Sequence, residues 1–239
     1  MAGRPQPDSF VLQRHTSTDA QPILVKLRRN ARATRLTLRI AQRDGAVTLT
    51  LPPRTPVAEA QRFAESRRDW IIRHLPAQGL HALRLGDQIP LRGTLLTLAT
   101  GAQRGVQATP TQLCVPGGVA LGPRVAAFLK AQARDDISHA ADIYAAKTGR
   151  AFTRLTLRDT RSRWGSCTSD GALMFNWRLV MAPPAILHYV AAHEVAHLTH
   201  MDHSDRFWSL VAQIFPDHAA ARQWLRTHGV ALQRLDFSS

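Results

Sequence analysis

The sequence is poor in cysteine and contains no long apolar run, and each absence excludes a class of protein. No apolar stretch approaches the roughly 20 residues that cross a bilayer, and the first residues lack the uninterrupted hydrophobic region of a secretory signal. The only cysteines, Cys114 and Cys167, cannot form a disulfide framework and are not arranged as a CxxC pair. We therefore expect no membrane-spanning segment and a location in the reducing cytoplasm.

Acidic residues are also scarce, and glutamate is the scarcest of them. The chain has 31 Lys and Arg against 17 Asp and Glu; 28 of the basic residues are arginine and only three residues are glutamate. The formal charge of +14 suits an anionic partner such as a nucleotide or a nucleic acid. No arginine cluster accompanies a nucleic-acid-binding module, however, and an arginine bias can equally reflect genomic base composition. Charge alone therefore names no partner.

The proportions of hydrophobic residues (44%) and charged residues (20%) are those of an ordinary folded chain. With 239 residues, we expect one catalytic-sized unit and a smaller companion. Residues 1–21 are rich in Gly, Pro, Ser, Thr and Gln and predict a flexible tail. Residues 22–120 predict a β-rich domain with one helix, and residues 121–239 predict a domain of mixed helices and strands. The expected fold class is α+β, with a domain boundary near residue 120.

Local patterns support this division. Asp44-Gly45 lies between two alternating apolar runs and predicts a hairpin turn. Thr55-Pro56 begins a helical pattern that extends to Leu75. A long helix from Pro123 to Gly149 opens the second predicted domain.

One of the three glutamates lies between two histidines in His193-Glu194-Val195-Ala196-His197, an H-E-x-x-H motif on a predicted helix. In a helix the two imidazoles lie about 40° apart on one face, so they can hold one metal ion. Zinc accepts neutral imidazole nitrogens and, in catalytic sites, keeps a water molecule where three protein ligands leave a position open. Glu194, about 100° around the helix, can reach that water as a general base. The motif predicts a zinc-dependent hydrolase in which Glu194 is catalytic.

The spacing leaves the third metal ligand open. The candidates are His200, Asp202, His203, Asp205 and His218. His200 would share the face of His193 but lie about 10 Å further along the helix axis, too far to share one ion. A turn after Thr199 would bring His203 back to the metal, and the polar stretch that follows permits such a turn. We therefore predict His203 as the third ligand, with Asp202 and Asp205 orienting imidazoles or capping a helix.

A second motif, Arg161-Ser-Arg-Trp-Gly-Ser-Cys167, precedes a predicted strand. In one interpretation it forms a cleft wall: Arg163 offers a charge-assisted donor to a carboxylate or phosphate, and the backbone after Gly165 can approach a ligand closely. In the other, it is a tight strand connection with a buried Trp164 and Cys167. The candidate substrate-binding residues are Arg161, Arg163 and Asn176.

Both motifs resemble the YgjP-like metallopeptidase family, and so do further residues along the chain. These are Asn176, Leu179, Pro183, Tyr189-Val190, His203-Ser204 and Phe207-Trp208. The resemblance extends over most of the chain from about Ile23, and the C-terminal part is also similar to the SprT-like and Wss-like minimal zincins. The metzincins share the six-residue step to the third histidine, but their intervening glycine is His200 here, so the turn must be built differently.

The resemblance implies a zincin core, with a long backing helix, a small sheet whose edge strand borders the cleft, and an active-site helix. It implies His193, His197 and His203 as zinc ligands and Glu194 as catalytic base. It also implies that the predicted strand from Ala172 to Leu179 presents unpaired backbone groups to an extended peptide.

We therefore expect a zinc metallopeptidase that acts on a peptide or protein; the sequence leaves the oligomeric state open and favours a monomer. One alternative is a nucleotide pyrophosphohydrolase that uses the same metal site, with Arg161 and Arg163 binding phosphates. Another is a DNA-associated protease similar to the SprT-like enzymes, whose basic N-terminal part docks on nucleic acid.

Overall fold

The computed structural model describes residues 8–13, 22–41, 43–76, 80–101, 104–118 and 120–238. These residues form two compact units, one that ends at Leu80 and one that begins at His81. Among the described residues, no helix combines the length and the apolar character that crossing a membrane requires.

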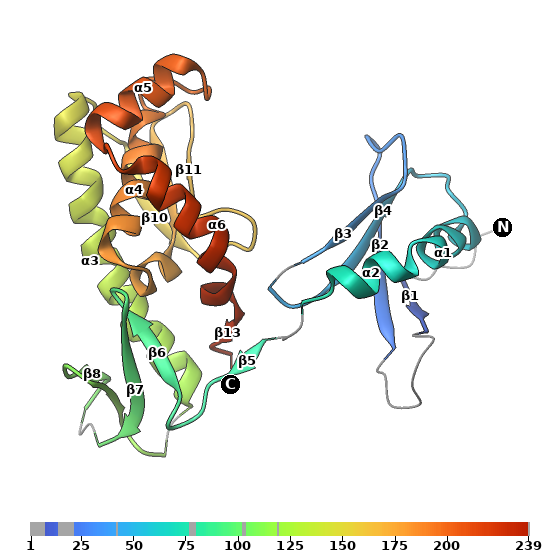
Figure 1. Ribbon diagram of the computed structural model, residues 1–239, viewed down its shortest axis with the longest axis horizontal. Coiled ribbons are helices and arrows are strands. Elements are labelled where there is room, and N and C mark those ends of the chain that lie inside the picture. Colours follow the sequence, from blue (N-terminus) through green and yellow to red (C-terminus); the bar gives the residue numbers. More distant parts are fainter. Residues whose placement is uncertain are drawn as a thin grey trace. The chain divides into compact units, whose positions relative to one another are not determined.

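The N-terminal unit is a four-stranded sheet with two helices on one face (Figure 1). Its elements are β1 (Ser9–Leu12), β2 (Ile23–Arg29), β3 (Thr37–Ile40), β4 (Val47–Leu51), α1 (Val57–Ser66) and α2 (Arg68–His74). The strand order is β1-β2-β4-β3, and β3 and β4 are antiparallel, as the hairpin predicts. Gly45 adopts φ 69° in the turn, a conformation that glycine takes at little steric cost. Leu12, Val25, Leu49 and Ile71 form the centre of the core.

Two expectations for this unit differ from the structure. The prediction of one helix to Leu75 is wrong because Arg67, with φ −108° and ψ 10°, separates α1 from α2. The predicted flexible tail contains β1, which pairs with β2 and buries Leu12 completely. The other residues of that tail, apart from 8 and 13, lie outside the described residues.

The C-terminal unit contains two larger sheets, a short strand pair and the main helices (Figure 1). Its strands are β5 (His81–Ala82), β6 (Gln88–Leu91), β7 (Thr94–Thr100), β8 (Gln107–Ala108), β9 (Gln112–Val115), β10 (Arg154–Arg158), β11 (Gly165–Cys167), β12 (Ala172–Asn176) and β13 (Leu235–Asp236). Its helices are α3 (Leu121–Thr148), the 3-10 helix η1 (Trp177–Met181), α4 (Pro184–Ala196), α5 (Asp205–Ile214) and α6 (His218–Arg234). The α+β fold class is as expected.

The division after Leu80 differs from the boundary expected near residue 120. The strands β6 to β9 form one sheet, and their buried residues Leu98 and Leu113 belong to the same hydrophobic cluster as Val125 and Leu129 of α3. The change from strands to helix near residue 120 is therefore a change of element inside one unit.

Helix α3 is the expected long helix and packs against α4 and η1. It ends at Gly149, whose left-handed conformation (φ 64°) accommodates the helix end. Its buried residues recur at helical spacing and include Leu129, Ile137 and Tyr144. Helix α3 thus packs against α4, the helix that carries the H-E-x-x-H motif.

The small sheet beside α4 has the order β10-β12-β11. The central strand β12 pairs with β10 in parallel and with β11 in antiparallel orientation. The expectation that the strand from Ala172 to Leu179 presents a free edge is therefore wrong, because both sides of β12 are paired. The two edge strands are β10 and β11, and β11 is a three-residue strand inside the Arg161–Cys167 motif that lies next to α4.

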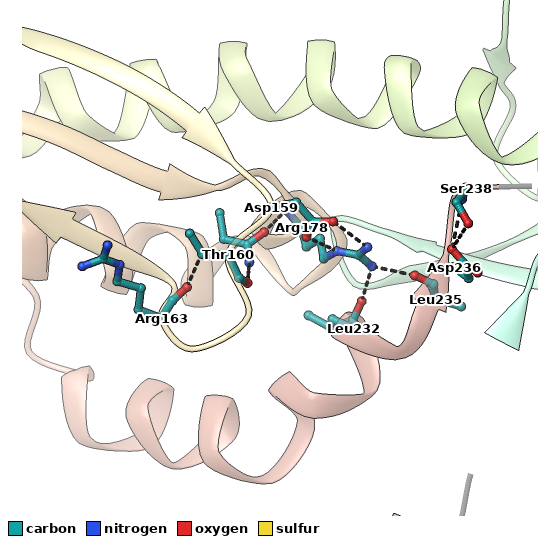
Figure 2. A network of polar contacts seen from close by, with 9 residues as sticks. Asp159, Thr160, Arg163, Arg178, Leu232, Leu235, Asp236 and Ser238 are labelled. Carbon is teal, nitrogen blue, oxygen red and sulfur yellow. Dashed lines mark hydrogen bonds and ion pairs between the residues drawn. The ribbon is translucent and has the colours of Figure 1, made fainter. Parts of the chain in front are cut away.

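A buried arginine joins this sheet to the end of α6. Arg178 is 1% exposed, and its Nε and Nη2 donate to the carboxylate of Asp159 at 2.7 and 3.0 Å. Its Nη1 donates to the carbonyl oxygens of Leu232 (3.0 Å) and Leu235 (2.9 Å), as Figure 2 shows. The same guanidinium thus holds the start of the loop that leads to β11 and the C-terminal end of α6.

Candidate metal centre

Helix α4 places His193 and His197 next to each other at its C-terminal end. The helix starts at Pro184, where a missing backbone N–H costs nothing, and Ala196 is its last residue. The two imidazole ring centroids are 5.0 Å apart. This neighbouring arrangement is the one that the four-residue spacing predicts.

The chain then turns and brings a third histidine back to the same place. The helix ends at Ala196 and a turn follows, in which the backbone N–H groups of Thr199 and His200 both donate to the carbonyl oxygen of Ala196 at 3.0 Å. Nε2 of His203 lies 3.2 Å from Nε2 of His193, and the His203 and His197 ring centroids are 4.7 Å apart. The structure therefore brings together the three histidines that the sequence analysis selected.

The other candidate ligands have different roles. His200 contributes its backbone carbonyl oxygen, which accepts a hydrogen bond from Nδ1 of His197 at 2.9 Å. The carboxylate of Asp202 accepts hydrogen bonds from Ser204, at 2.8 Å from Oγ and 3.3 Å from the backbone nitrogen, and so stabilises the turn. Asp205 begins α5, and the ring of His218 packs near Trp208. None of these residues belongs to the group of metal-binding side chains among the described residues.

The three imidazoles fit a tetrahedral metal ion. Their ligand atoms all lie within 4.8 Å of one another. Two nitrogens bound at 2.0–2.1 Å to tetrahedral zinc are about 3.3 Å apart, close to the 3.2 Å between Nε2 of His193 and Nε2 of His203. Because Nδ1 of His197 donates to His200, its Nε2 lone pair is left to bind a metal.

The protonation states also suit metal binding. Burial, followed by the charges of His197 and His203, lowers the pKa of His193 to about 3. Burial likewise lowers the pKa of His197. Both imidazoles are therefore neutral at neutral pH, which is the form that binds a metal.

Phe207 packs against all three imidazoles, a role that the sequence analysis missed. Its side chain is completely buried, and its ring stacks on His197 with a centroid separation of 4.4 Å and an interplanar angle of 25°. Its centroid is 4.9 Å from the rings of both His193 and His203. The sequence signals Phe207 only as part of Phe207-Trp208, a pair that carries the family resemblance and equally fits the ordinary core.

Glu194 lies beside this cluster in an apolar environment. It is 6% exposed, and burial raises its pKa to about 8, although the positive charge of Arg163 opposes the rise. A carboxyl group whose pKa lies near neutrality can accept and return a proton at that pH.

Two pockets meet at this site. The first, of about 250 Å³, contains the three histidines, Glu194 and the β11 residues. The second, of about 240 Å³, has a more apolar lining that includes Trp164, Tyr189, Val190 and Leu225. Arg163, Gly165, His193 and Glu194 line both pockets. The candidate catalytic residues thus lie between two hollows that can each receive part of a substrate.

The three candidate substrate-binding residues differ in their position relative to the two pockets. Arg163 is exposed and lines both pockets, whereas Arg161 is exposed and lines neither. Asn176 is completely buried; its amide donates to the carbonyl oxygen of Thr160 at 2.8 Å and accepts from the backbone of Arg178 at 3.0 Å. Asn176 therefore supports the loop that carries Arg163 and does not face the pockets.

Cys167 lines the first pocket but is not among the three clustered metal-binding residues. Burial, reinforced by the charges of Glu194 and Asp170, raises the pKa of its thiol to about 11. The thiol is therefore protonated at neutral pH in the metal-free protein.

The outer edge of β11 borders the first pocket. The backbone N–H of Asn176 donates to the carbonyl oxygen of Trp164 (2.8 Å), and that of Thr168 donates to Ala172 (3.0 Å). Hydrogen-bonded pairs alternate in antiparallel strands, so Gly165 and Cys167 direct their own backbone N–H and C=O groups away from β12. No other described strand pairs with this edge.

Comparison with known proteins gives one match that covers most of the chain. A family model described as a YgjP-like metallopeptidase domain matches residues 34–228. Among solved structures, the chain is similar to the crystal structure of the metallopeptidase zymogen of Pyrococcus abyssi abylysin. That similarity has a TM-score of 0.34 and 23% sequence identity, and covers 43% of this chain and 97% of that chain. No curated protein matches the sequence.

Proposed function

Since this chain belongs to the YgjP-like metallopeptidase family, we propose that it is a zinc-dependent peptidase with His193, His197 and His203 as ligands and Glu194 as general base. The observation that carries the proposal is the convergence of three imidazoles, with ligand atoms within 4.8 Å of one another, beside a buried carboxyl group. Three nitrogen ligands that leave a fourth position open form the donor set of a catalytic zinc site, and a neighbouring carboxylate can act there as a base.

The chain's own residues would divide the chemistry as follows. A bound zinc ion supplies Lewis acidity to the scissile carbonyl and makes a water molecule easier to deprotonate. Glu194 accepts the proton of the attacking water on its carboxylate and returns it to the leaving amine nitrogen. Burial of Glu194 excludes bulk water from this transfer. Arg163, at the junction of the two pockets, can hold a substrate carbonyl or carboxylate oxygen.

The substrate that suits this site is an extended peptide. The backbone groups of Gly165 and Cys167 at the outer edge of β11 offer hydrogen bonds to an added strand. A peptide bound there would run along the pocket that contains Glu194 and the histidines. Main-chain pairing of this kind does not depend on side-chain identity, so we propose an unfolded or flexible protein as the substrate class.

The direct test is cleavage of an unfolded protein by the wild type and two variants. Glu194→Gln keeps the three imidazoles, so we expect one zinc per chain and a loss of turnover of about 10²-fold or more. His193→Ala should lose both zinc and turnover. Pyrophosphate release from nucleoside triphosphates, measured in parallel, tests the nucleotide alternative. Full activity of Glu194→Gln would reject the mechanism, and pyrophosphate release without proteolysis would reject the peptidase proposal.

A second candidate, a protease that works on nucleic acid, has one observation in its favour. On the sheet face opposite the N-terminal core, Lys26, Arg28 and Arg39 are exposed, and the half-buried Thr48 of β4 lies opposite Lys26 and Arg39. None of the described strands of this sheet contains an acidic residue. Cations and hydroxyl groups are the usual partners of phosphate oxygens.

Stimulation of proteolysis by duplex DNA separates this candidate from a peptidase without a nucleic-acid partner. The stimulation should disappear when Lys26, Arg28 and Arg39 are replaced by glutamine together. The same triple replacement at Arg62, Arg67 and Arg73 of the helical region is a control of equal charge. An absence of any effect of DNA on turnover would remove this candidate.

A further inference from the structure

Gly165, the first residue of β11, has no room for a side chain because Glu194 fills the space. A Cβ atom built on Gly165 would lie 2.5 Å from both Cγ and Oε1 of Glu194 and 2.7 Å from Cδ. Non-bonded carbon atoms are at optimal separation at about 3.5–4.0 Å. Gly165 is not among the glycines with positive φ. The requirement for glycine is therefore one of space beside Glu194 and not of backbone conformation.

The backbone of Gly165 is held in place from the side of the sheet. Gly165 lies opposite Phe175 of the central strand, and Phe175 is completely buried. The carbonyl oxygen of the preceding residue, Trp164, accepts a hydrogen bond from the backbone of Asn176 at 2.8 Å. The loop before it is fixed by the amide of Asn176, which donates to Thr160. A clash at Gly165 therefore cannot be relieved by a free movement of the strand.

Helix α6 holds the neighbouring Trp164 through a second close approach. A Cβ atom on Gly229 would lie 2.9 Å from Cζ2 of Trp164 and 3.3 Å from its Nε1. The indole ring thus rests directly on the backbone of α6. Trp164 and Gly165 are consecutive, so α6 supports the same point of the strand that meets Glu194.

We propose that Gly165 is a positioning residue whose bare Cα forms the wall against which the Glu194 side chain rests. A glutamate side chain has three rotatable bonds, and holding such a side chain in one conformation costs conformational entropy. Contact with Gly165 restricts that freedom and fixes the carboxylate between the two pockets. The catalytic consequence rests on the proposed function of Glu194, whereas the packing consequence does not.

The test is Gly165→Ala, with Gly117→Ala as a matched control. A Cβ atom on Gly117 would meet no atom within 4 Å, so that variant should behave as the wild type. Gly165→Ala should bind one zinc per chain, because the three histidines are untouched. It should also keep its KM, because alanine retains the backbone N–H and C=O groups that would pair with the peptide. Its kcat on an unfolded protein should fall about 10²-fold, which is the effect of displacing a catalytic group by about 1 Å. Wild-type kcat in Gly165→Ala would overturn the proposal.

Thermal unfolding of double variants tests the contact without relying on activity. Gly165→Ala should lower the Tm by several degrees in the wild type and in Glu194→Gln, whose side chain has the same shape. The loss should vanish in Glu194→Ala, where the added methyl group finds space. If Gly165→Ala does not fold, the double variant with Glu194→Ala should still fold. An equal Tm loss in all three backgrounds, or a double variant that does not fold, would overturn the proposal.

These two experiments separate the failure of this inference from failure of the proposed function. A wild type with no peptidase activity would reject the function, while the pattern of Tm values would still decide whether Gly165 and Glu194 are in contact.

Discussion

Nδ1 of His197 donates a hydrogen bond to the backbone carbonyl oxygen of His200 at 2.9 Å. This bond selects the tautomer of His197 that leaves Nε2 open, and it does so without the His200 side chain. His200 therefore contributes to the metal centre through its backbone only, whereas His203, three residues later, contributes its imidazole.

Alanine substitution should lower the metal content at His203 and leave it unchanged at His200. His203→Ala removes a ligand and should leave much less than one zinc per chain after purification without added metal. His200→Ala keeps the carbonyl oxygen that orients His197 and should retain one zinc per chain. Elemental analysis of both variants checks this difference, and full zinc content in His203→Ala would remove that residue from the ligand set.

Phe207→Ala should weaken metal binding although Phe207 is not a ligand. The ring contacts all three imidazoles, so its loss lets them rotate, and a loss of about 10- to 100-fold in zinc affinity is typical of such supporting residues. Competition with a chromophoric chelator measures the affinity. Val211→Ala on the same helix is the control: Val211 is completely buried, so this variant should lose stability but keep wild-type affinity.

The metal-free protein should become less stable as the pH rises from about 6.5 to about 8, because below about 6.5 the lowered pKa values of His193 and His197 act in the opposite direction. Burial raises the pKa of Glu194 from 4.5 to about 8, so in this range the folded state keeps a proton that the unfolded state has lost. Stability then falls by up to about 1.4 kcal/mol per pH unit. Glu194→Gln cannot ionise, so in excess chelator it should lack this component and exceed the wild-type Tm at pH 8. Parallel Tm profiles of the two proteins would show that Glu194 does not cause the loss.

Replacing Arg178 by methionine should destabilise the C-terminal unit by about 1–3 kcal/mol, because it removes the ion pair with Asp159, whose side chain is 35% exposed, and the donor to two carbonyl oxygens. Urea unfolding measures the change. The contrasting pair is Arg154 and Asp170, whose charged atoms are 3.9 Å apart and whose side chains are 67% and 64% exposed. Arg154→Met should therefore leave the unfolding midpoint nearly unchanged.

The sequence predicts the parts of the site that depend on local spacing. The helical period alone places His193 and His197 on one face, and Gly149 and Pro184 mark helix ends through their own backbone chemistry. The turn that returns His203 is permitted by the polar residues after Thr199, but their pattern does not exclude a longer helix. Its presence depends on the packing of α5 through Phe207.

Contacts between distant segments could not be predicted in this way. The requirement for glycine at position 165 arises from Glu194, 29 positions later in the chain. Asn176 resembles a binding residue in the sequence because nothing local shows that Thr160 and Arg178 use its amide. The domain boundary predicted near residue 120 differs from the structure for the same reason. Only the folded chain shows that β6 to β9 and α3 share one hydrophobic cluster.

Two of the acceptors of Arg178, the carbonyl oxygens of Leu232 and Leu235, belong to the last few residues described. If a protease removed Leu232 and the residues after it, the guanidinium of Arg178, a side chain that is only 1% exposed, would lose both of these acceptors. The segment from Leu232 to Leu235 is thus as much a part of the enzyme's framework as its central strands.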